Sequence, residues 1–411
     1  MLLPIFLVVL VDIFAFTLVI PLLAIYAEHL GASPLQATLL VSVFAVCQLV
    51  SGPLLGRISD RVGRKPMLLV SQLGTLIGLL VMGSATSLAL LFLGRVIDGL
   101  TAGNLSLAQA YIADNTKPEN RARSFGIIGI AFGLGFFLGP STTAYLVQYG
   151  LHAPFHAAAA LSFASIVVTA LLLPNQAPAR DPRGRETGPG GQRLRLTDWG
   201  TYAQYFRRPV LSGLLAQFFF FAFAFTTFTS GFALFAERTF RWGDHPFTPR
   251  EIGYLFAYAG FLGIVLQGGL IGRLVKRFGE PALVSAGFAL MGVGYLLLGL
   301  IHDIAPLIVV TTLVALGQGL LRPALTSLIS QHADRTEQGM VLGLTQSLTS
   351  TAQVVAPPIG GWLIGAGYLE LWAFVAALAA GLGWLAASWG SARAVLADTA
   401  VTSGASRRTG A

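Results

Sequence analysis

Charged side chains are scarce in this sequence. Asp, Glu, Lys and Arg make up 11% of the 411 residues, whereas 55% of the residues are hydrophobic. A typical soluble domain carries about 25% charged residues. This chain has too few charges to cover a water-exposed surface, so its composition excludes an ordinary soluble globular protein.

Cysteines, metal-binding clusters and phosphate-binding loops are also lacking. The one cysteine, Cys47, excludes an intramolecular disulfide. The six histidines do not follow the spacing of metal ligands, and no glycine-rich phosphate-binding loop occurs. We therefore expect no metal, no cofactor, no ATP-driven step and no enzymatic reaction.

The apolar residues are gathered into runs of about 20, the length that a helix needs to cross a bilayer core. Each run predicts a helix, because a lipid-exposed backbone must satisfy its own hydrogen bonds and no run alternates like a barrel strand. The first run is too long for a signal-peptide core and predicts a retained helix. The twelve runs lie at about 2–27, 35–56, 67–86, 88–113, 122–148, 153–174, 209–235, 251–272, 282–301, 305–330, 338–365 and 369–391. The predicted fold is an all-α integral membrane protein with twelve transmembrane helices.

A polar stretch divides the chain into two parts. Residues 175–208 are rich in arginine, proline and glycine, which is typical of a linker. They separate an expected N-terminal six-helix bundle, 1–174, from a C-terminal six-helix bundle, 209–392. The remaining residues, 393–411, are polar, and we expect them to form a disordered tail.

The two parts share a sequence pattern. Residues 56–63, GRISDRVG, follow the second run and match residues 272–279, GRLVKRFG, which follow the eighth. This repeat predicts two pseudo-symmetric bundles. Transporters built from two repeats hold their substrate near the membrane midplane, where the repeats meet.

The net charge of +8 has a topological explanation. Apart from two arginines within the runs, the Lys and Arg residues gather in alternate connections; the other connections hold Arg238, Arg241 and Arg250. The positive-inside rule then predicts that both termini and the linker are cytoplasmic, in a multi-pass protein of the cell (inner) membrane. We expect no nucleic-acid partner, and we expect the protein to act as a monomer.

Four ionisable residues lie well inside apolar runs: Asp12, Arg95, Asp98 and Arg322. Each costs about 2.5–3.5 kcal/mol at the bilayer centre, so such residues mark functional sites by default. Arg95 and Asp98 are three residues apart on one helix and can pair directly. The four residues either lock helices together or exchange protons in response to a bound substrate. We interpret Asp12 as the proton-coupling residue, tuned by Arg95 and Asp98.

Amides and aromatic rings at membrane depth are candidates for substrate contact. Gln48, Asn104 and Gln217 offer hydrogen bonds, and Phe221 and Phe225 belong to a phenylalanine-rich helix whose rings can face an apolar or cationic ligand. Arg322 would suit an anionic or acidic substrate, or would simply balance an aspartate. The alternative for each is a role in helix packing, and for many of the phenylalanines a contact with lipid.

Three motifs resemble those of a known family. Residues 56–66 resemble the loop signature of the major facilitator superfamily, and the run containing Arg95, Gly99 and Gly103 resembles its second motif. Residues 133–140 resemble the motif associated with antiporters. The resemblance covers the whole chain and is closest to the twelve-helix drug/proton antiporters, especially the tetracycline/proton antiporter branch.

The resemblance implies a two-bundle fold in which helices 1, 4, 7 and 10 line a central cavity. It implies proton-coupled export of small amphipathic compounds by alternating access. The implied residues of the gating motif are Gly56, Asp60, Arg61, Gly63, Arg64 and Asp114, and those of the antiporter motif are Gly135, Gly139 and Pro140.

Several positions depart from that branch. Its acid in helix three is replaced near Gly78, its histidine in helix eight near Gly263, and its acid in helix nine near Met291. We therefore do not expect tetracycline itself, carried as a metal chelate, to be the substrate. The alternatives are a symporter or uniporter for a sugar or organic anion on the same fold, and a membrane receptor or assembly factor without transport activity.

The gating motif generates a first prediction. Asp60 is expected to accept hydrogen bonds from the N-terminus of the helix at 338–365, and Arg64 to pair with Asp114, which together would hold the outward-open state. Asp60→Asn should then shift the population toward the inward-open state. Cysteine-accessibility labelling of cytoplasmic positions measures this shift, and unchanged labelling would rule out the latch.

Overall fold

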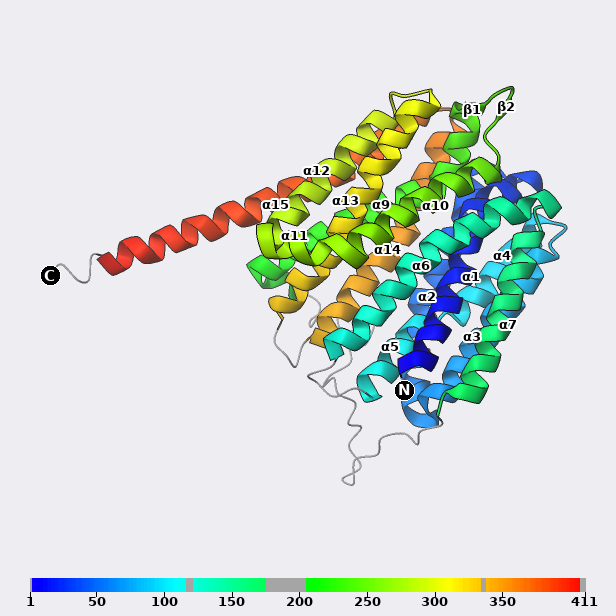
Figure 1. Ribbon diagram of the computed structural model, residues 1–411, viewed down its shortest axis with the longest axis horizontal. Helices are drawn as coiled ribbons and strands as arrows, with labels where there is room; N and C mark the ends of the chain where they lie inside the picture. Colours follow the sequence, from blue (N-terminus) through cyan, green and yellow to red (C-terminus); the bar gives the residue numbers. More distant parts are fainter. Residues whose placement is uncertain (1, 116–120, 175–204, 334–337, 407–411) are drawn as a thin grey trace.

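The computed structural model describes residues 2–115, 121–174, 205–333 and 338–406, and within them it consists of helices and one short hairpin (Figure 1). The first part of the chain forms α1 (Leu2–His29), α2 (Pro34–Val62), α3 (Arg64–Gly83), α4 (Leu88–Leu100), α5 (Asn104–Asn115), α6 (Arg121–Leu146), the 3₁₀ turn η2 (Val147–Tyr149) and α7 (Ala153–Leu172).

The second part of the chain repeats this helical layout. It forms α9 (Pro209–Thr239), the strands β1 (Arg241–Trp242) and β2 (His245–Pro246), α10 (Pro249–Val265), the π-helical segment η3 (Leu266–Leu270), α11 (Ile271–Phe278), α12 (Glu280–Leu298), α13 (Ile304–Gln331), α14 (Gln338–Gly365) and α15 (Leu369–Ser406). The strands pair antiparallel, and the sequence did not predict them.

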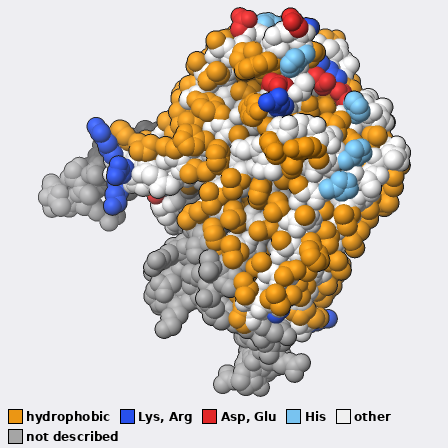
Figure 2. All heavy atoms as spheres, turned by 45° about the vertical axis from the view of Figure 1, so that its right-hand side comes forward, with side chains coloured by type: hydrophobic (Ala, Val, Ile, Leu, Met, Phe, Trp, Pro, Cys, Tyr) orange, Lys and Arg blue, Asp and Glu red, His pale blue; other side chains and the backbone are white. Residues whose placement is uncertain are grey.

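Among the described residues, eleven helical segments are long and apolar enough to cross a membrane. The remaining long helix, α14, has 28 residues but is more polar along its middle. Hydrophobic side chains cover most of the face in Figure 2, acidic and histidine side chains lie mostly in its upper part, and a group of basic side chains lies at its left edge. On α3, the exposed residues Val70, Leu73, Ile77 and Leu80 form a stripe at helical spacing, as a lipid-facing surface requires. The prediction of an all-α membrane protein is confirmed.

The run predicted at 88–113 is interrupted between α4 and α5. The Ser71 hydroxyl of α3 donates to the Thr101 carbonyl and accepts the Gly103 N–H at 2.9 Å. The Thr101 hydroxyl turns back to the Ile97 carbonyl at 2.8 Å. These bonds from side chains replace helical backbone bonds, so the chain stops and restarts its helix here.

Two further expectations differ from the structure. The eighth run is not a uniform α-helix, because η3 contains Gly268 and Gly269, which have no side chains to stabilise regular helical packing. The tail that we expected to be disordered from 393 is helical up to Ser406. It is the end of α15, which continues away from the other helices (Figure 1). Of the predicted linker, 175–208, residues 175–204 lie outside the described residues.

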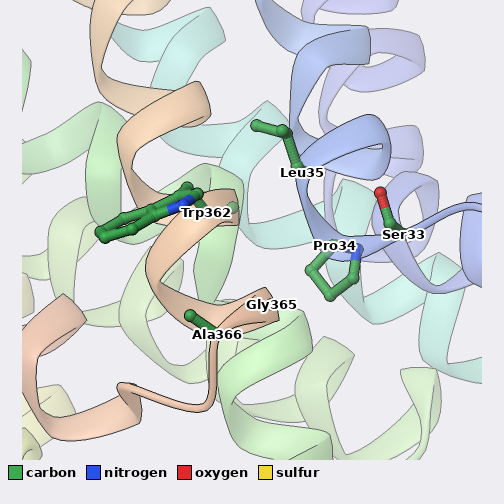
Figure 3. Close-up of a pocket in the computed structure, with 7 residues that line it drawn as sticks. Ser33, Pro34, Leu35, Trp362, Gly365 and Ala366 are labelled. Atoms are coloured by element: carbon green, nitrogen blue, oxygen red, sulfur yellow. The ribbon is translucent and has the colours of Figure 1, made fainter.

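The two halves meet through closely packed helices. Glycines allow this approach: a Cβ on Gly260 of α10 would lie 2.5 Å from the Phe136 carbonyl oxygen of α6, and one on Gly361 of α14 would lie 2.7 Å from the Pro34 carbonyl oxygen of α2. A pocket of about 330 Å³ opens beside the second contact, lined by Pro34, Trp362 and Ala366 among others (Figure 3). The α2–α14 and α6–α10 pairs therefore form the junction between the halves.

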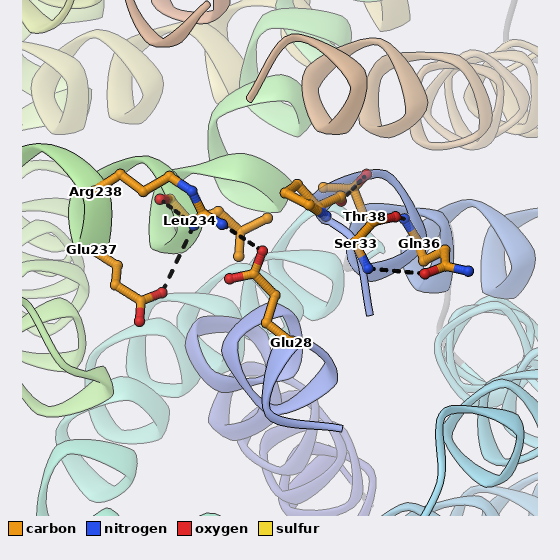
Figure 4. Close-up of polar contacts among 8 residues, drawn as sticks. Glu28, Ser33, Gln36, Thr38, Leu234, Glu237 and Arg238 are labelled. Atoms are coloured by element: carbon orange, nitrogen blue, oxygen red, sulfur yellow. Dashed lines mark hydrogen bonds and ion pairs between the residues drawn. The ribbon is translucent and has the colours of Figure 1, made fainter. Parts of the chain in front are cut away.

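An ion pair between α1 and α9 also joins the two halves (Figure 4). It lies at the end of the molecule that holds the β1–β2 hairpin, here called the hairpin end. Arg238, near the end of α9, contacts Glu28, near the end of α1, with 2.7 Å between Nη2 and Oε1. The Arg238 Nη1 also donates to the Leu234 carbonyl at 3.0 Å. Together with the Pro34–Gly361 contact, this pair holds the halves together at the hairpin end.

We predict that Glu28→Gln or Arg238→Gln favours conformations that are open at the hairpin end. A partly exposed pair contributes about 1 kcal/mol, which corresponds to about a fivefold change in the population ratio. Spin labels at the exposed positions Tyr149 and His245 would report the distance between the halves. The charge swap Glu28→Arg/Arg238→Glu should restore the distance distribution.

Arg241→Gln is the matched control, since its guanidinium bonds to the Asp244 carbonyl within the hairpin and not to the other half. Identical distance distributions in the wild type, the Glu28 variant and the Arg238 variant would contradict the prediction.

Candidate functional site

Arg95 and Asp98 form a buried pair on α4. The Arg95 Nη1 lies 3.5 Å from the Asp98 Oδ2, and the two residues are 6% and 7% exposed. The Arg95 Nε donates to the Leu40 carbonyl of α2 at 3.2 Å, and the guanidinium lies 4.5 Å from the centre of the Phe44 ring. The predicted pairing is therefore present, and Arg95 also fixes α4 against α2.

Asp98 faces α3. The Thr75 side chain is its hydrogen-bond partner there, and a Cβ on Gly78 would lie 2.9 Å from the Asp98 Cβ. A larger residue at Gly78 would displace Asp98. The sequence lacks an acid near Gly78, and the structure fills this region with a carboxylate from α4.

Asp12 lies at mid-length on α1 and is partly buried. Its carboxylate has the Ser165 hydroxyl of α7 and the Gln72 amide of α3 as hydrogen-bond partners, and Asp98 is near enough to act on it electrostatically. Asp12, Asp98 and Arg95 therefore share one polar region inside the first half. In this structure Asp12 faces α3 and α7.

Arg322 of α13 reaches the opposite half of the molecule. Its guanidinium lies 4.5 Å from the centre of the Phe132 ring on α6, a cation–π contact. The residue is solvent-accessible. Within the described part of the chain, no carboxylate pairs with it. Arg322 is therefore an accessible cation on an aromatic surface at the junction between the halves.

The three amides suggested for substrate contact occupy different surroundings. Gln48 is partly buried on α2. Asn104 is the first residue of α5, after the helix break, and its Oδ1 is buried without a partner among the described residues. Gln217 is buried and donates to the Ala386 carbonyl of α15 at 3.4 Å, which is a packing contact. The Gln217 amide is thus used in packing and the Asn104 oxygen is buried, whereas Gln48 is partly exposed.

The phenylalanines of α9 stack on one another. Phe221 is buried, and its ring centre lies 6.1 Å from that of the partly buried Phe225 in a stacked arrangement. Phe228 continues the aromatic surface toward Phe256 of α10 and Tyr295 of α12. These rings hold the second half together, and Phe225 is the more accessible of the two candidates.

The gating motif forms a compact turn between α2 and α3. Arg64 pairs with Asp60 at 2.6 Å and donates to the Ser59 hydroxyl at 2.6 Å. Gly63 has φ +108°, which L side chains rarely adopt, and its N–H donates to the Ser59 carbonyl. The structure therefore shows Arg64 with Asp60. The Asp114 side chain lies outside the described residues, so the Arg64–Asp114 contact stays a prediction.

Two other residues of this motif have simpler surroundings. Arg61 is exposed, and the Gly56 carbonyl accepts a hydrogen bond from the Ser59 hydroxyl at 2.7 Å.

The antiporter motif places α6 between α1 and α10. A Cβ on Gly135 would lie 2.5 Å from Ile13, and one on Gly139 would lie 2.1 Å from the Thr17 hydroxyl. Thr17 also donates to the Gly135 carbonyl at 2.7 Å. On the other side of α6, the Pro140 carbonyl lies against Gly253 of α10. The motif thus links the helix that carries Asp12 to the junction between the halves.

Two residues of the polar region were missed by reasoning from sequence. Gln72 and Ser165 lie inside the runs at 67–86 and 153–174, so the search for amides within the runs could have found Gln72. Ser165 carries no such signal, because serine is common in helix-packing surfaces of membrane proteins. Only the packing of α7 against both α1 and α3 brings both next to Asp12.

The fold and these charges at depth define a membrane transporter built from two similar helical halves, and not an enzyme. The family model for the Major Facilitator Superfamily matches residues 5–279 and 244–406. The chain therefore belongs to the Major Facilitator Superfamily, as its motifs predicted.

Proteins that confer drug resistance are among its relatives. The chain is 32% identical over 337 residues to the tetracycline resistance protein, class C, of Escherichia coli, covering 81% of this chain and 79% of that protein. It is 28% identical over 350 residues to multidrug resistance protein 2 of Bacillus subtilis (strain 168), covering 84% of each.

Solved structures share the fold. The crystal structure of the human organic anion transporter MFSD10 (TETRAN) has a TM-score of 0.69 at 23% identity, covering 94% of this chain and 98% of that one. A mutant of the peptide transporter POT in complex with sulfate has a TM-score of 0.76 at 16% identity, covering 95% of this chain and 94% of that one.

The surroundings of Arg322 generate a prediction. If its guanidinium recognises an anionic group, Arg322→Gln should reduce transport of an anionic substrate at least about tenfold, and Arg322→Lys should restore only part of it, because lysine lacks the planar fork. Uptake into proteoliposomes measures this. Arg273→Gln, at an exposed position on α11, is the control. Unchanged transport by Arg322→Gln would remove Arg322 from the substrate-binding residues.

Proposed function

We propose that this protein is a proton-coupled antiporter that exports small amphipathic compounds by alternating access. The observation that carries the proposal is the position of Asp12, an acid at membrane depth whose hydrogen-bond partners are uncharged. An isolated carboxylate is costly to ionise there, so a proton on it is readily exchanged against other changes in the site. The similarity to tetracycline and multidrug resistance proteins supports export of drug-like compounds.

The proposed cycle uses the contacts between the halves. In this structure the Glu28–Arg238 pair and the Pro34–Gly361 contact join the halves at the hairpin end. We assign this end to the outside of the cell, because the positive-inside rule places both termini in the cytoplasm of a cell-membrane protein. Substrate would then enter from the cytoplasm, and protonation of Asp12 would accompany its release on the other side.

The proposed substrate surface lies at the junction between the halves. Arg322 on Phe132 supplies a cation beside an aromatic face, and Phe225, Gln48 and Asn104 supply apolar and hydrogen-bonding groups. Phe221 and Gln217 support this surface from within the second half. Such a mixture suits compounds that are partly apolar and carry a few polar groups. We propose that one monomer performs the whole cycle.

A second candidate function is transport of an organic anion, by symport or uniport. The specific observation in its favour is that Arg322 is accessible and has no carboxylate partner within the described part of the chain. A cation in such a position attracts an anion of matching size. An imposed proton gradient distinguishes the two candidate functions. An antiporter moves its substrate in the direction opposite to the proton flow, whereas a symporter moves its substrate in the same direction as the protons.

Asp12→Asn tests the leading proposal. The amide resembles the protonated acid in volume, so the protein should fold, but it cannot release a proton. Gradient-driven transport in proteoliposomes should fall at least about a hundredfold, whereas substrate binding to the purified protein should change much less. Asp244→Asn, at an exposed position in the hairpin connection, is the matched control. Full gradient-driven transport by the Asp12 variant would end the proposal.

A further inference from the structure

Gln72 is a completely buried amide that uses only part of its hydrogen-bonding capacity. Its Nε2 donates to the Ser165 Oγ of α7 at 2.7 Å, and its backbone carbonyl accepts from the Ser162 hydroxyl at 3.3 Å. Its Oε1 is buried without a partner among the described residues. A buried amide oxygen left unpaired is costly, so a role for it has to be sought.

The neighbour of this amide is the Asp12 carboxylate, which has both Ser165 and Gln72 as hydrogen-bond partners. An ionised carboxylate only accepts hydrogen bonds, whereas a protonated carboxyl group must also donate one. The site therefore needs donors in one state and an acceptor in the other. A hydroxyl group and a carboxamide are uncharged groups that supply both.

We propose that Gln72 and Ser165 are positioning residues that support Asp12 in both of its protonation states through one reversible hydrogen-bond chain. When Asp12 is ionised, the Gln72 N–H donates to the Ser165 oxygen, and the Ser165 O–H donates to the carboxylate. When Asp12 gains a proton, its O–H donates to the Ser165 oxygen. The Ser165 O–H then donates to the Gln72 Oε1, which a half-turn of the amide brings to the place of Nε2.

In this hydrogen-bond chain, the only charge that moves is the proton that Asp12 gains or loses. The proton binds to a carboxylate oxygen of Asp12 and leaves from it, and the hydroxyl and amide hydrogens only change direction. The unpaired Oε1 is explained, because it is the acceptor of the protonated state. This inference rests on the proposed role of Asp12 as the proton site.

Other ionisable groups around Asp12 act from further away. Asp98 affects it electrostatically, and Arg95 pairs with Asp98. Among the other helices packed against α1, Tyr111 of α5 lies in the same apolar cluster as Ile5 and Val8. At mid-depth, α2 contributes Cys47 and α10 contributes Tyr258, while 130–142 of α6, 160–170 of α7 and 214–230 of α9 carry no ionisable side chain.

The test follows the proton on Asp12 without any substrate. Infrared difference spectra of the purified protein in lipid, recorded over a pH series, show the C=O band of protonated carboxyl groups. Asp12→Asn identifies the part of this band that belongs to Asp12. Gln72→Met keeps the volume of the side chain and removes both the donor and the acceptor.

The ionised state loses more in Gln72→Met, because the Gln72 amide is also a hydrogen-bond partner of the Asp12 carboxylate, and hydrogen bonds to a charged acceptor are the stronger ones. We therefore expect the Asp12 band to persist about one pH unit higher, a tenfold change in proton affinity. The band should also move toward the frequency of an unbonded carboxyl group. Gln318→Met is the matched control, because Gln318 donates to the Tyr295 hydroxyl in the other half at 3.2 Å. It should leave the band unchanged.

Ser165→Ala keeps the inference testable if Gln72→Met does not fold. Removing the Ser165 hydroxyl, the middle group of the hydrogen-bond chain, should move the Asp12 band in the same direction. Ser165→Thr, which retains the hydroxyl, should leave the band near the wild-type position. An Asp12 band that is unaffected by Gln72→Met or by Ser165→Ala would overturn the inference. If the band shifts as expected but transport does not depend on the proton gradient, the proposed function is contradicted, whereas the inferred hydrogen-bond chain still holds.

Discussion

Ionised side chains are costly in the membrane interior, and the first half of this protein meets that cost in two ways. Arg95 and Asp98 neutralise each other within α4 and are further held by Leu40 and Phe44 of α2 and Thr75 of α3. Among the described residues, Asp12 has no basic partner of its own, and its hydrogen-bond partners are uncharged. An arginine partner favours the ionised form of a buried carboxylate, and an unpaired carboxylate lacks this stabilisation. This difference supports the proposal that Asp12 is the proton site.

Close backbone approach connects the proposed proton site to the junction between the halves. Thr17, about one and a half turns from Asp12 on α1, packs directly on Gly139 of α6, and α6 in turn packs on Gly253 and Gly260 of α10. Small residues permit such close approach of helix backbones. One helix, α6, therefore separates α1, which carries Asp12, from α10 at the junction between the halves.

Much of the candidate site was predictable because the membrane makes depth readable from sequence. Asp12, Arg95, Asp98 and Arg322 stand out against apolar runs, and the spacing of Arg95 and Asp98 predicted their pairing. What the spacing did not reveal is the direction in which each side chain points. Gln217 was predicted to contact substrate, yet its amide is used to pack α9 on α15. Gln72 was not considered, yet it lies beside Asp12.

The sequence by itself determined that this protein is a two-part bundle of transmembrane helices of the Major Facilitator Superfamily, because hydrophobic length, charge depth and local motifs are properties of single segments. Only the tertiary structure decided which helices Asp12 and Arg322 face, that Ser71 of α3 interrupts the helix after Leu100, and that Glu28 pairs with Arg238. These features join residues far apart along the chain. Their formation depends on how whole helices rotate and approach one another, which no local pattern specifies.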